Sequence, residues 1–395
     1  MRDGWEIKTL GEVCDISAGQ GAPQGEENYC LEGTPFIKAG NLEALVNGEG
    51  EQSVQKVSKE VALSHRLVLQ KKGSIVFAKS GMSCMKGYIY TLQQDCYVVS
   101  HLAILFPKCV SGAYLNYALH FFKPSSLASD ASFPSITLKD LALFPIPFPV
   151  SLEEQQRIVD ILDQEFAKID ALKANAEKSL QAAKNLFQTI LRRELVPIVG
   201  KNGCSMKPVV KLGDVCNICG GYTPKPAQLF KEGAIPYYKV ADMNRPGNER
   251  ELNYTDLYMK EARKTFPKGA IVFPKNGGAV ATNKKRILAQ DAVVDLNTGI
   301  AIPTTKISNQ YLYYYFQGID FKLFTKEGTL PVLRTKAIEE LPLYLPSLQE
   351  QDSVVLRLND LNENTKQLQD NYQKTLTLCD DLKQALLRKA FNGEL

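Results

Sequence analysis

The sequence lacks any long apolar run, and this absence excludes a chain that spans a membrane. Its longest apolar stretch, Leu141 to Val150, contains three prolines and is too short to cross a bilayer. The first residues show no apolar segment of the kind found in secretory leaders. Nine cysteines without such a leader indicate a reducing compartment, because an odd count fits free thiols better than a disulfide framework. We therefore expect a cytoplasmic protein with no membrane partner.

Residues that commonly carry catalysis are also scarce. The chain has only three histidines, and none of them forms an i, i+4 pair. Its one C-x-x-C, from Cys216 to Cys219, lacks the second pair of ligands that zinc requires. No G-x-x-x-x-G-K-[ST] phosphate loop occurs, and neither does the Asn-Pro-Pro-Tyr or Asp-Pro-Pro-Tyr tetrapeptide of many base-methylating enzymes. These absences predict a binding protein with no catalytic, metal or cofactor site of its own.

The composition is that of an ordinary globular protein. Charged residues make up 23% of the chain and apolar residues 44%, which argues against disorder and allows each domain a normal core. A length of 395 residues predicts two or three domains. The net charge of +4 is too small to indicate nucleic acid by itself.

The most informative feature of the sequence is an internal duplication. Four segments of the first half return in the same order in the second half, at offsets that drift only from about 202 to about 196 residues. A period this long indicates two whole modules rather than a solenoid. The repeated segments begin at Leu10 and Leu212, Pro35 and Pro236, Gly73 and Gly269, and Ser151 and Ser347.

Each copy divides into a β-rich module and a long helical segment. The modules, 1–150 and 207–346, contain short apolar runs separated by Gly, Pro and Asn. In them we expect buried strands at 74–78 and 270–273, a longer strand at 97–106, and short aromatic helices at 114–122 and 311–316. The remaining segments, 151–206 and 347–395, contain the long helices at 152–195 and 348–390, which have neither proline nor glycine.

The two long segments each carry one apolar seam with steps of three and four residues, which is typical of a coiled coil. A helix of about 44 residues is about 65 Å long and could not bury such a seam alone. Two independently dimerising helices are one interpretation; pairing of the two helices with each other fits two seams of equal length better. The seam positions are Leu162, Phe166, Ile169, Lys173, Ala176, Leu180, Ala183, Phe187 and Ile190 in the first helix, and Leu358, Leu361, Thr365, Leu368, Tyr372, Thr375, Cys379, Leu382 and Leu386 in the second.

With these motifs in place, the chain resembles the DNA specificity subunit of type I restriction–modification enzymes. The resemblance is carried by Trp5-Glu6-Ile7-Lys8-Thr9-Leu10-Gly11-Glu12-Val13, by Ser-Leu-x-Glu-Gln at both helix starts, by Ile158-Val159-Asp160-Ile161-Leu162-Asp163, and by the terminal residues from Leu386 to Leu395. It covers essentially the whole chain. One departure is Gln351-Asp352-Ser353, which stands where the first copy has Gln155-Gln156-Arg157.

The resemblance implies an α+β fold with two tandem target-recognition domains, each followed by a long helix. The helices would pair as an antiparallel coiled coil with pseudo-two-fold symmetry. It further implies a non-catalytic subunit that reads a bipartite site on double-stranded DNA, one half per domain. The partners would be two methyltransferase subunits docked on the helix pair, which bring S-adenosylmethionine, and restriction subunits, which bring ATP and magnesium.

Charge supports DNA binding unevenly between the two modules. Segment 207–346 holds 20 Lys and Arg against 13 Asp and Glu, whereas segment 1–150 holds 13 against 14. Only the second module therefore has the positive excess expected for binding phosphates, although a solvated surface could show the same excess.

Candidate DNA contacts lie in two loops that both copies carry. Lysine and arginine can bind phosphates or guanine, and asparagine can bind adenine, while glycines let a backbone approach the duplex. The alternative for each residue is an ordinary exposed turn, and Lys284-Lys285-Arg286 is the strongest cluster. The candidates are Lys38 and Asn41, with Lys239, Asp242 and Asn244, in the first loop, and Lys79, Ser80, Ser83 and Lys86, with Lys275, Asn276, Thr282, Asn283, Lys284, Lys285 and Arg286, in the second.

Two other functions remain open at this point. A fused restriction or methylation enzyme is disfavoured by its missing motifs and by the short chain. A coiled-coil adaptor that never touches DNA would show no salt-dependent binding to a duplex. The tyrosines at 311 and 313–315 suit helix packing better than base stacking.

Overall fold

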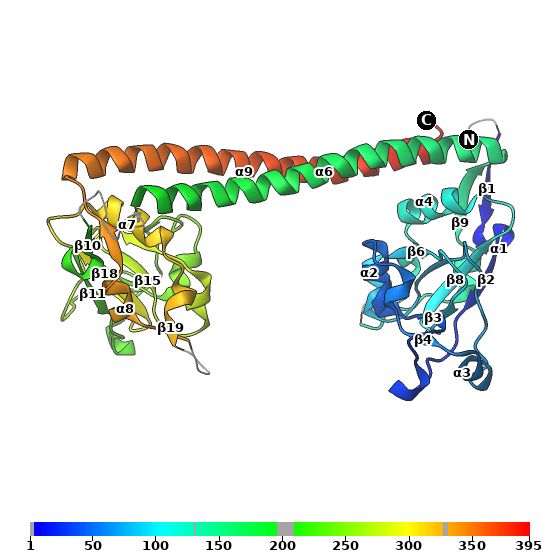
Figure 1. Ribbon diagram of the computed structural model, residues 1–395, viewed down its shortest axis with the longest axis horizontal. Helices are drawn as coiled ribbons and strands as arrows, with labels where there is room; N and C mark the ends of the chain where they lie inside the picture. The colour runs from blue at the N-terminus through cyan, green and yellow to red at the C-terminus, as the bar shows by residue number, and fades with distance from the viewer. Residues whose placement is uncertain (1–3, 130–131, 196–208, 327–330) are drawn as a thin grey trace, which may run out of the picture. The chain divides into compact units, whose positions relative to one another are not determined.

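The computed structural model describes residues 4–129, 132–195, 209–326 and 331–395. It has two compact units, and the long helices contribute to both. Unit 1 comprises residues 1–175 and 375–395, and unit 2 comprises residues 176–374. Each unit joins one β-rich module to parts of two helices, α6 (Leu152–Leu195) and α9 (Leu348–Phe391). The predicted bounds of both helices are therefore confirmed to within one residue, in an α+β fold (Figure 1).

The described residues of unit 1 form three small sheets. Its largest sheet is antiparallel, with the strand order β2-β8-β5-β6, and the others are β4-β3-β7 and β1-β9. The helix α4 (Gly112–Phe122) packs between this module and α6 (Figure 1). The strands are β1 (Trp5–Thr9), β2 (Cys14–Ala18), β3 (Thr34–Ile37), β4 (Lys56–Val57), β5 (Ile75–Ala78), β6 (Ile89–Thr91), β7 (Tyr97–Val98), β8 (Leu102–Pro107) and β9 (Pro145–Pro149). The short helices are α1 (Leu10–Val13), α2 (Leu42–Val46), α3 (Lys59–Ser64) and α5 (Leu138–Ala142).

Unit 2 repeats this plan with one extra strand in the main sheet, whose order is β11-β18-β15-β16-β13. The sheets β14-β12-β17, β10-β21 and β19-β20 complete it, with α7 (Asn309–Gly318) in the place of α4. The strands are β10 (Val209–Lys211), β11 (Cys216–Gly220), β12 (Ile235–Tyr238), β13 (Glu251–Leu252), β14 (Tyr258–Met259), β15 (Ile271–Pro274), β16 (Arg286–Leu288), β17 (Val293–Val294), β18 (Thr298–Pro303), β19 (Thr325–Lys326), β20 (Val332–Leu333) and β21 (Pro342–Tyr344), and the remaining helix is α8 (Thr335–Glu339).

One predicted element is wrong in its extent. The single strand expected at 97–106 is two strands, β7 and β8, which belong to different sheets. The chain turns between them, where the Leu102 N–H donates to the Val99 carbonyl at 3.0 Å and the Val99 N–H donates to Ile37 at 2.9 Å. A continuous apolar run does not reveal such a turn, because buried residues on both sides of it look alike in sequence.

The helices α6 and α9 run antiparallel to each other within each unit. In unit 1, Asp170 pairs with Lys383 at 2.6 Å and Lys173 pairs with Asp380 at 2.7 Å. The residue numbers rise along α6 while those of their partners fall along α9. Lys173, the non-apolar member of the predicted seam, thus has an acidic partner on the other helix. In unit 2, Arg357 lies 3.2 Å from Glu194.

The predicted seam is correct for α6 and partly wrong for α9. Leu368 and Leu382 are 42% and 48% exposed, although the heptad pattern places them in the seam. A straight helix has 3.6 residues per turn, so a 3.5-residue pattern drifts off the contact line. Near Leu382 the contact line passes through Lys383, whose ammonium lies 4.9 Å from the centre of the Phe166 ring.

The repeated Ser-Leu-x-Glu-Gln motif joins each long helix to its module. Its glutamine, Gln155 in α6, is fully buried, accepts a hydrogen bond from Ser111 N–H at 2.7 Å and donates to the Pro149 carbonyl at 2.8 Å. Gln351 in α9 does the same with Ser308 N–H at 2.8 Å and Pro346 at 2.9 Å. The glutamine thus pairs a backbone N–H at the start of α4 or α7 and a proline carbonyl just before the long helix.

We expect Gln155→Ala to lower the free energy of unfolding of unit 1 by about 2–3 kcal/mol, because it leaves buried polar backbone groups unpaired. Urea unfolding followed by fluorescence measures this directly, since the single tryptophan, Trp5, packs against the core of unit 1. Gln156→Ala is the matched control, because that side chain is exposed and bonds only Asp160. Equal stabilities of the two variants would contradict the assigned role.

Candidate nucleic-acid interface

The two repeated loops of the second module meet at an open hollow. The first loop follows β12 and the second follows β15, and a third segment, between β17 and β18, lies beneath them. The hollow therefore brings together two of the predicted contact residues, Lys239 and Asn276. Its lining comprises Lys239, Val240, Ala241, Asn276, Gly277, Gly278, Ala279, Asp295, Asn297 and Val332.

We call the place where the two repeated loops meet the junction. The first module has the same junction, built from equivalent backbone hydrogen bonds. The Lys79 N–H donates to the His101 carbonyl at 2.9 Å, and the Lys275 N–H donates to the Asn297 carbonyl at 2.8 Å. Glycine is required beside both junctions. A methyl group at Gly19 would lie 1.9 Å from the Val98 carbonyl oxygen. In the second module, a methyl group at Gly221 would lie 2.2 Å from the Val294 carbonyl oxygen.

The side chains at this junction differ between the copies. In the first module the Ser80 hydroxyl and His101 Nδ1 share a hydrogen bond of 2.8 Å. In the second, Asn276 Nδ2 donates to Asn297 Oδ1 at 3.3 Å. One scaffold thus presents a hydroxyl and an imidazole in one copy and two carboxamides in the other, and these groups bond differently to base edges.

An aspartate, Asp295, lies at the hollow of the second module. Asp295 accepts hydrogen bonds from Tyr237 Oη at 2.9 Å, Thr223 Oγ1 at 2.8 Å and Asn297 N–H at 2.9 Å. Burial opposes its ionisation, but these bonds outweigh burial and hold the pKa of Asp295 below its ordinary value. The carboxylate is therefore charged at neutral pH, and it fixes Asn297 at the rim.

Candidates in the first loop shape turns more than they offer free groups. The Asn41 side chain accepts from Lys38 N–H at 2.8 Å, and the Asp242 side chain accepts from Lys239 N–H at 2.7 Å. Lys38 Nζ donates to Gln55 at 2.7 Å and lies over a tyrosine ring. Lys239 is exposed, and its ammonium makes no hydrogen bond or ion pair with a described residue.

The second loop of the first module contains both free and engaged groups. The Lys79 ammonium and the Ser83 hydroxyl are half-buried and have no hydrogen-bond or ion-pair partner among the described residues. Lys86 pairs with Glu43 at 3.2 Å, and Ser80 is engaged with His101. Within this loop, Lys79 and Ser83 are the candidates that are free to meet a ligand.

The corresponding loop of the second module is largely structural. Asn283 has a positive φ of 55° and accepts from Phe321 N–H at 2.9 Å, so it closes a turn. Thr282 donates to the Ala279 carbonyl at 2.7 Å. Lys275 stays half-buried, and its ammonium lies against Gly220.

The expectation that Lys284, Lys285 and Arg286 form one exposed cationic cluster is wrong. Lys285 is 1% exposed and donates to the Ile319 carbonyl at 2.6 Å, while Arg286 donates to the Met243 carbonyl at 2.9 Å. Lys284 bonds the side chain of the further candidate Asn244. Burial lowers the pKa of both Lys285 and Arg286. Side chains alternate between the two faces of an extended chain, and Lys285 points into the core.

The tyrosines of α7 pack in the core, as expected. Tyr311, Tyr313, Tyr314 and Tyr315 are all less than a tenth exposed, and Tyr311 Oη donates to the Tyr344 carbonyl at 2.8 Å. They therefore offer no ring face to a base.

Sequence reasoning missed His101, Asn297 and Asp295. The segments that carry them, before β8 and β18, share no recognisable motif between the copies. The offset between the two copies could have paired His101 with Asn297, because 196 residues separate them, as they separate the later repeated segments. Among the described residues, no helix is long and apolar enough to cross a membrane.

Comparisons with known proteins agree with this duplicated plan. Residues 2–182 and 206–377 match the type I restriction modification DNA specificity domain. The specificity subunit of the type I restriction enzyme MjaIX from Methanocaldococcus jannaschii is 22% identical, over 99% of this chain and 93% of its own length. The specificity subunit of EcoKI from Escherichia coli K12 is also 22% identical, over 100% of this chain and 90% of its own.

Solved structures show the same fold. The crystal structure of the HsdS subunit from Thermoanaerobacter tengcongensis superposes with a TM-score of 0.64 at 20% identity, covering 100% of this chain and 98% of the other. A chain from a study of assembly and conformational transition of a type I restriction–modification system reaches 0.80 at 18% identity, covering 100% and 99%. These relatives give no support to a fused enzyme or to an adaptor without DNA reading. The chain belongs to the type I restriction–modification DNA specificity family and is the sequence-recognition subunit, not a catalytic subunit, of such a system.

Proposed function

We propose that modules 1–150 and 207–346 each read one half of a bipartite DNA site, at the junction where their two repeated loops meet. The observation that carries the proposal is this junction, which keeps its backbone hydrogen bonds in both copies while its side chains change. A constant scaffold with variable groups suits two readers of unlike sequences.

The chemistry of each junction predicts unlike half-sites. Asn276 and Asn297 offer carboxamides, each of which can form two hydrogen bonds with N6 and N7 of adenine in the major groove, and the Asp295 carboxylate orients Asn297. His101 and Ser80 offer single donors or acceptors, above a floor where the chain has Val99 instead of the acid. The half-site of the second module is therefore more sharply defined in hydrogen-bonding pattern.

We expect the double variant Asn276→Ala, Asn297→Ala to relax one half-site only. In the assembled methyltransferase, the other half-site and the spacer between the halves should stay unchanged, because the first module keeps all its contacts. Mapping of methylated bases on genomic DNA measures this outcome, with a discrimination loss of about 1–3 kcal/mol per lost base contact.

His101→Ala is the reciprocal variant and should relax the opposite half-site. If both sets of substitutions affected the same half-site, or neither half-site changed, the junctions would not be the readers. Complex formation, checked by gel filtration of each variant with its methyltransferase partner, separates a reading defect from an assembly defect.

Lys239 is proposed to bind a phosphate rather than a base. Lys239→Ala should weaken binding about equally on all sequences and lower the slope of log K against log salt by up to about 0.9. Fluorescence anisotropy with a labelled duplex at several salt concentrations provides the slope. Lys211→Ala is the control, because that exposed lysine pairs with Glu340 at 2.6 Å. Identical slopes for both variants and the wild type would contradict the assignment.

The helix pair is proposed to dock two methyltransferase subunits, which supply S-adenosylmethionine, with restriction subunits supplying ATP and magnesium in the full complex. Large apolar side chains that the helix pair leaves exposed support this proposal. In unit 1, Leu172 and Leu378 are 51% and 64% exposed, and in unit 2, Leu186 and Leu356 are 43% and 64% exposed. These side chains would be removed from water by a partner that packs along the helices.

A further inference from the structure

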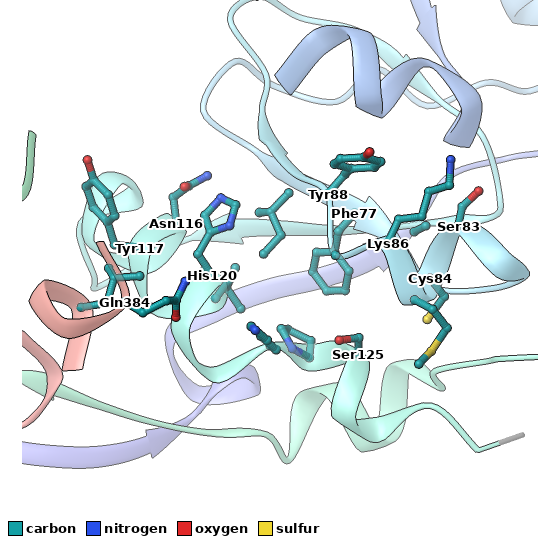
Figure 2. A pocket seen from close by; sticks show the side chains of 18 of the residues that line it. Phe77, Ser83, Cys84, Lys86, Tyr88, Asn116, Tyr117, His120, Ser125 and Gln384 are labelled. Atoms are coloured by element: carbon teal, nitrogen blue, oxygen red, sulfur yellow. The ribbon is translucent and has the colours of Figure 1, made fainter. Parts of the chain in front are cut away.

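A cavity of about 550 Å³ lies in unit 1, and Ser83 and Lys86 at the end of the second loop form part of its lining. It is lined by the 3-10 turn at Met82–Lys86, the C-terminal end of α4 and the helices α6 and α9, and it is partly open to solvent. Figure 2 shows Phe77 near its centre, with His120 and Gln384 on one side and Lys86 with Ser83 on the other. A cavity of this size can hold a small organic molecule.

The lining of the cavity combines apolar and cationic side chains. Phe77, Leu119, Phe166 and Leu387 supply ring and aliphatic surface. Three lysines line the rim, and no lining residue is an aspartate or glutamate. Lys86 and Lys383 pair with Glu43 and Asp170, which lie outside the lining. Lys123 has no ion pair with a described residue.

Several polar side chains that line the cavity have no partner within the described residues. The His120 imidazole, the Ser125 hydroxyl and the Gln384 carboxamide make no hydrogen bond to them. Burial lowers the pKa of His120, so its ring is neutral at neutral pH and offers both a donor and an acceptor. These side chains are partly or fully exposed, so water satisfies them in the free protein, and the polar atoms of a ligand would replace that water.

The second module has different side chains at the same place. There the corresponding hollow holds about 240 Å³, and a hollow of about 600 Å³ adjoins it. Phe321, fully buried, takes the place of Pro124, and its ring lies 5.0 Å from Phe273. Lys285 occupies the position of Ile89 and packs 4.2 Å from the Phe321 ring. The lining of the cavity therefore differs between the two copies, and Phe321 and Lys285 occupy in the second copy the positions of Pro124 and Ile89.

We propose that this cavity binds a small organic anion with an aromatic ring, whose ring packs against Phe166 beside Phe77 and whose acidic group meets His120 and the lining lysines. Rings pack well against Phe77 and Phe166, which present faces and edges. The acidic group then has Lys123 as its free cation, with Lys86 and Lys383 nearby. Such a ligand would also bridge module and helices, because the lining comes from both.

The test uses 1-naphthyl phosphate as the probe, with 1-naphthol and inorganic phosphate as its neutral and ring-free counterparts. The full chain has three histidines, His65, His101 and His120, so its imidazole NMR signals are few and can be assigned with His120→Gln. The probe should shift only the His120 signal and raise the pKa of His120, because a nearby anion favours the protonated ring. Affinity should consequently rise as pH falls.

Two variants copy the second module and locate the site. Pro124→Phe introduces the ring that Phe321 provides at the equivalent position of the second module. Lys123→Asp introduces the aspartate that the second module has at Asp320. Each should weaken binding of the probe at least tenfold by calorimetry, while binding of duplex DNA stays unchanged. Lys123→Asp changes an exposed residue, so it tests the proposal even if Pro124→Phe does not fold.

The proposal is overturned if His120 does not respond to millimolar 1-naphthyl phosphate, or if neither variant weakens binding. It is also overturned if inorganic phosphate alone, or 1-naphthol alone, binds as tightly as the probe. Equal binding of inorganic phosphate would show an ion site that does not recognise a ring. Equal binding of 1-naphthol would show an apolar cavity that does not recognise charge. These outcomes are independent of DNA reading, so they leave the proposed function untouched.

Discussion

Replacing Phe391 by alanine is expected to lower the free energy of unfolding of unit 1 by about 3–5 kcal/mol, the cost of removing a large ring from a packed core. Phe391 lies near the end of α9, more than 240 residues from most of the module that it completes. Its ring centre is 5.4 Å from each of Tyr114, Phe121 and Phe122 on α4. The end of the second helix is thus part of the first module's core.

Trp5 fluorescence during urea unfolding reports this loss, because Trp5 packs against the same core. Leu382→Ala on the same helix is the control and should cost well under 1 kcal/mol, since that leucine is 48% exposed. Similar losses in both variants would mean that α9 contributes only helix pairing.

The counterpart in unit 2 is Leu195, which precedes Phe391 by 196 residues and is 1% exposed. Leu195→Ala should cost about 2–5 kcal/mol and leave unit 1 intact. Hydrogen exchange measured peptide by peptide separates the two units. Protection should fall in the second module only, whereas Phe391→Ala should affect the first module only.

Much of this architecture is readable from sequence because long elements repeat a signal many times. The bounds of α6 and α9 follow from a missing proline and glycine and from a seam of nine positions each. The duplication then predicts two modules, since one offset recurs. What the heptad pattern could not show is that Leu387 and Phe391 leave the helix–helix contact and enter a module core, because burial against a module needs no seven-residue repeat.

Reading the candidate site from sequence was harder, because its residues lie in loops without periodicity. Lysine in a loop suggests a phosphate contact, yet Lys38 bonds Gln55 and Lys285 is buried. Composition gives the charge of a module, but only the fold decides which charges face solvent. Aligning the two copies residue by residue would have placed Lys285 on buried Ile89, and that alignment was the one available warning.

Lys285→Met should change how the stability of unit 2 depends on pH. Burial, as the main cause, lowers the pKa of Lys285 from 10.5 to about 7 in the folded chain. Between these two values the unfolded chain binds more protons than the folded one, so the free energy of unfolding rises with pH across this window. Below pH 7 the folded core must hold a charged ammonium, at a cost on the order of 4 kcal/mol relative to pH 10.5.

Methionine keeps the length of the side chain without the charge, so Lys285→Met should stabilise unit 2 most at pH 6 and progressively less toward pH 10. Subtracting the wild-type curve from the variant curve cancels the titration of all other groups. Lys284→Met is the matched control, because Lys284 is half-buried and bonds the Asn244 side chain, and its difference curve should be flat. A flat difference curve for Lys285→Met as well would show that Lys285 keeps its charge in the folded core, held by the Ile319 carbonyl, Asn283 and the Phe321 ring.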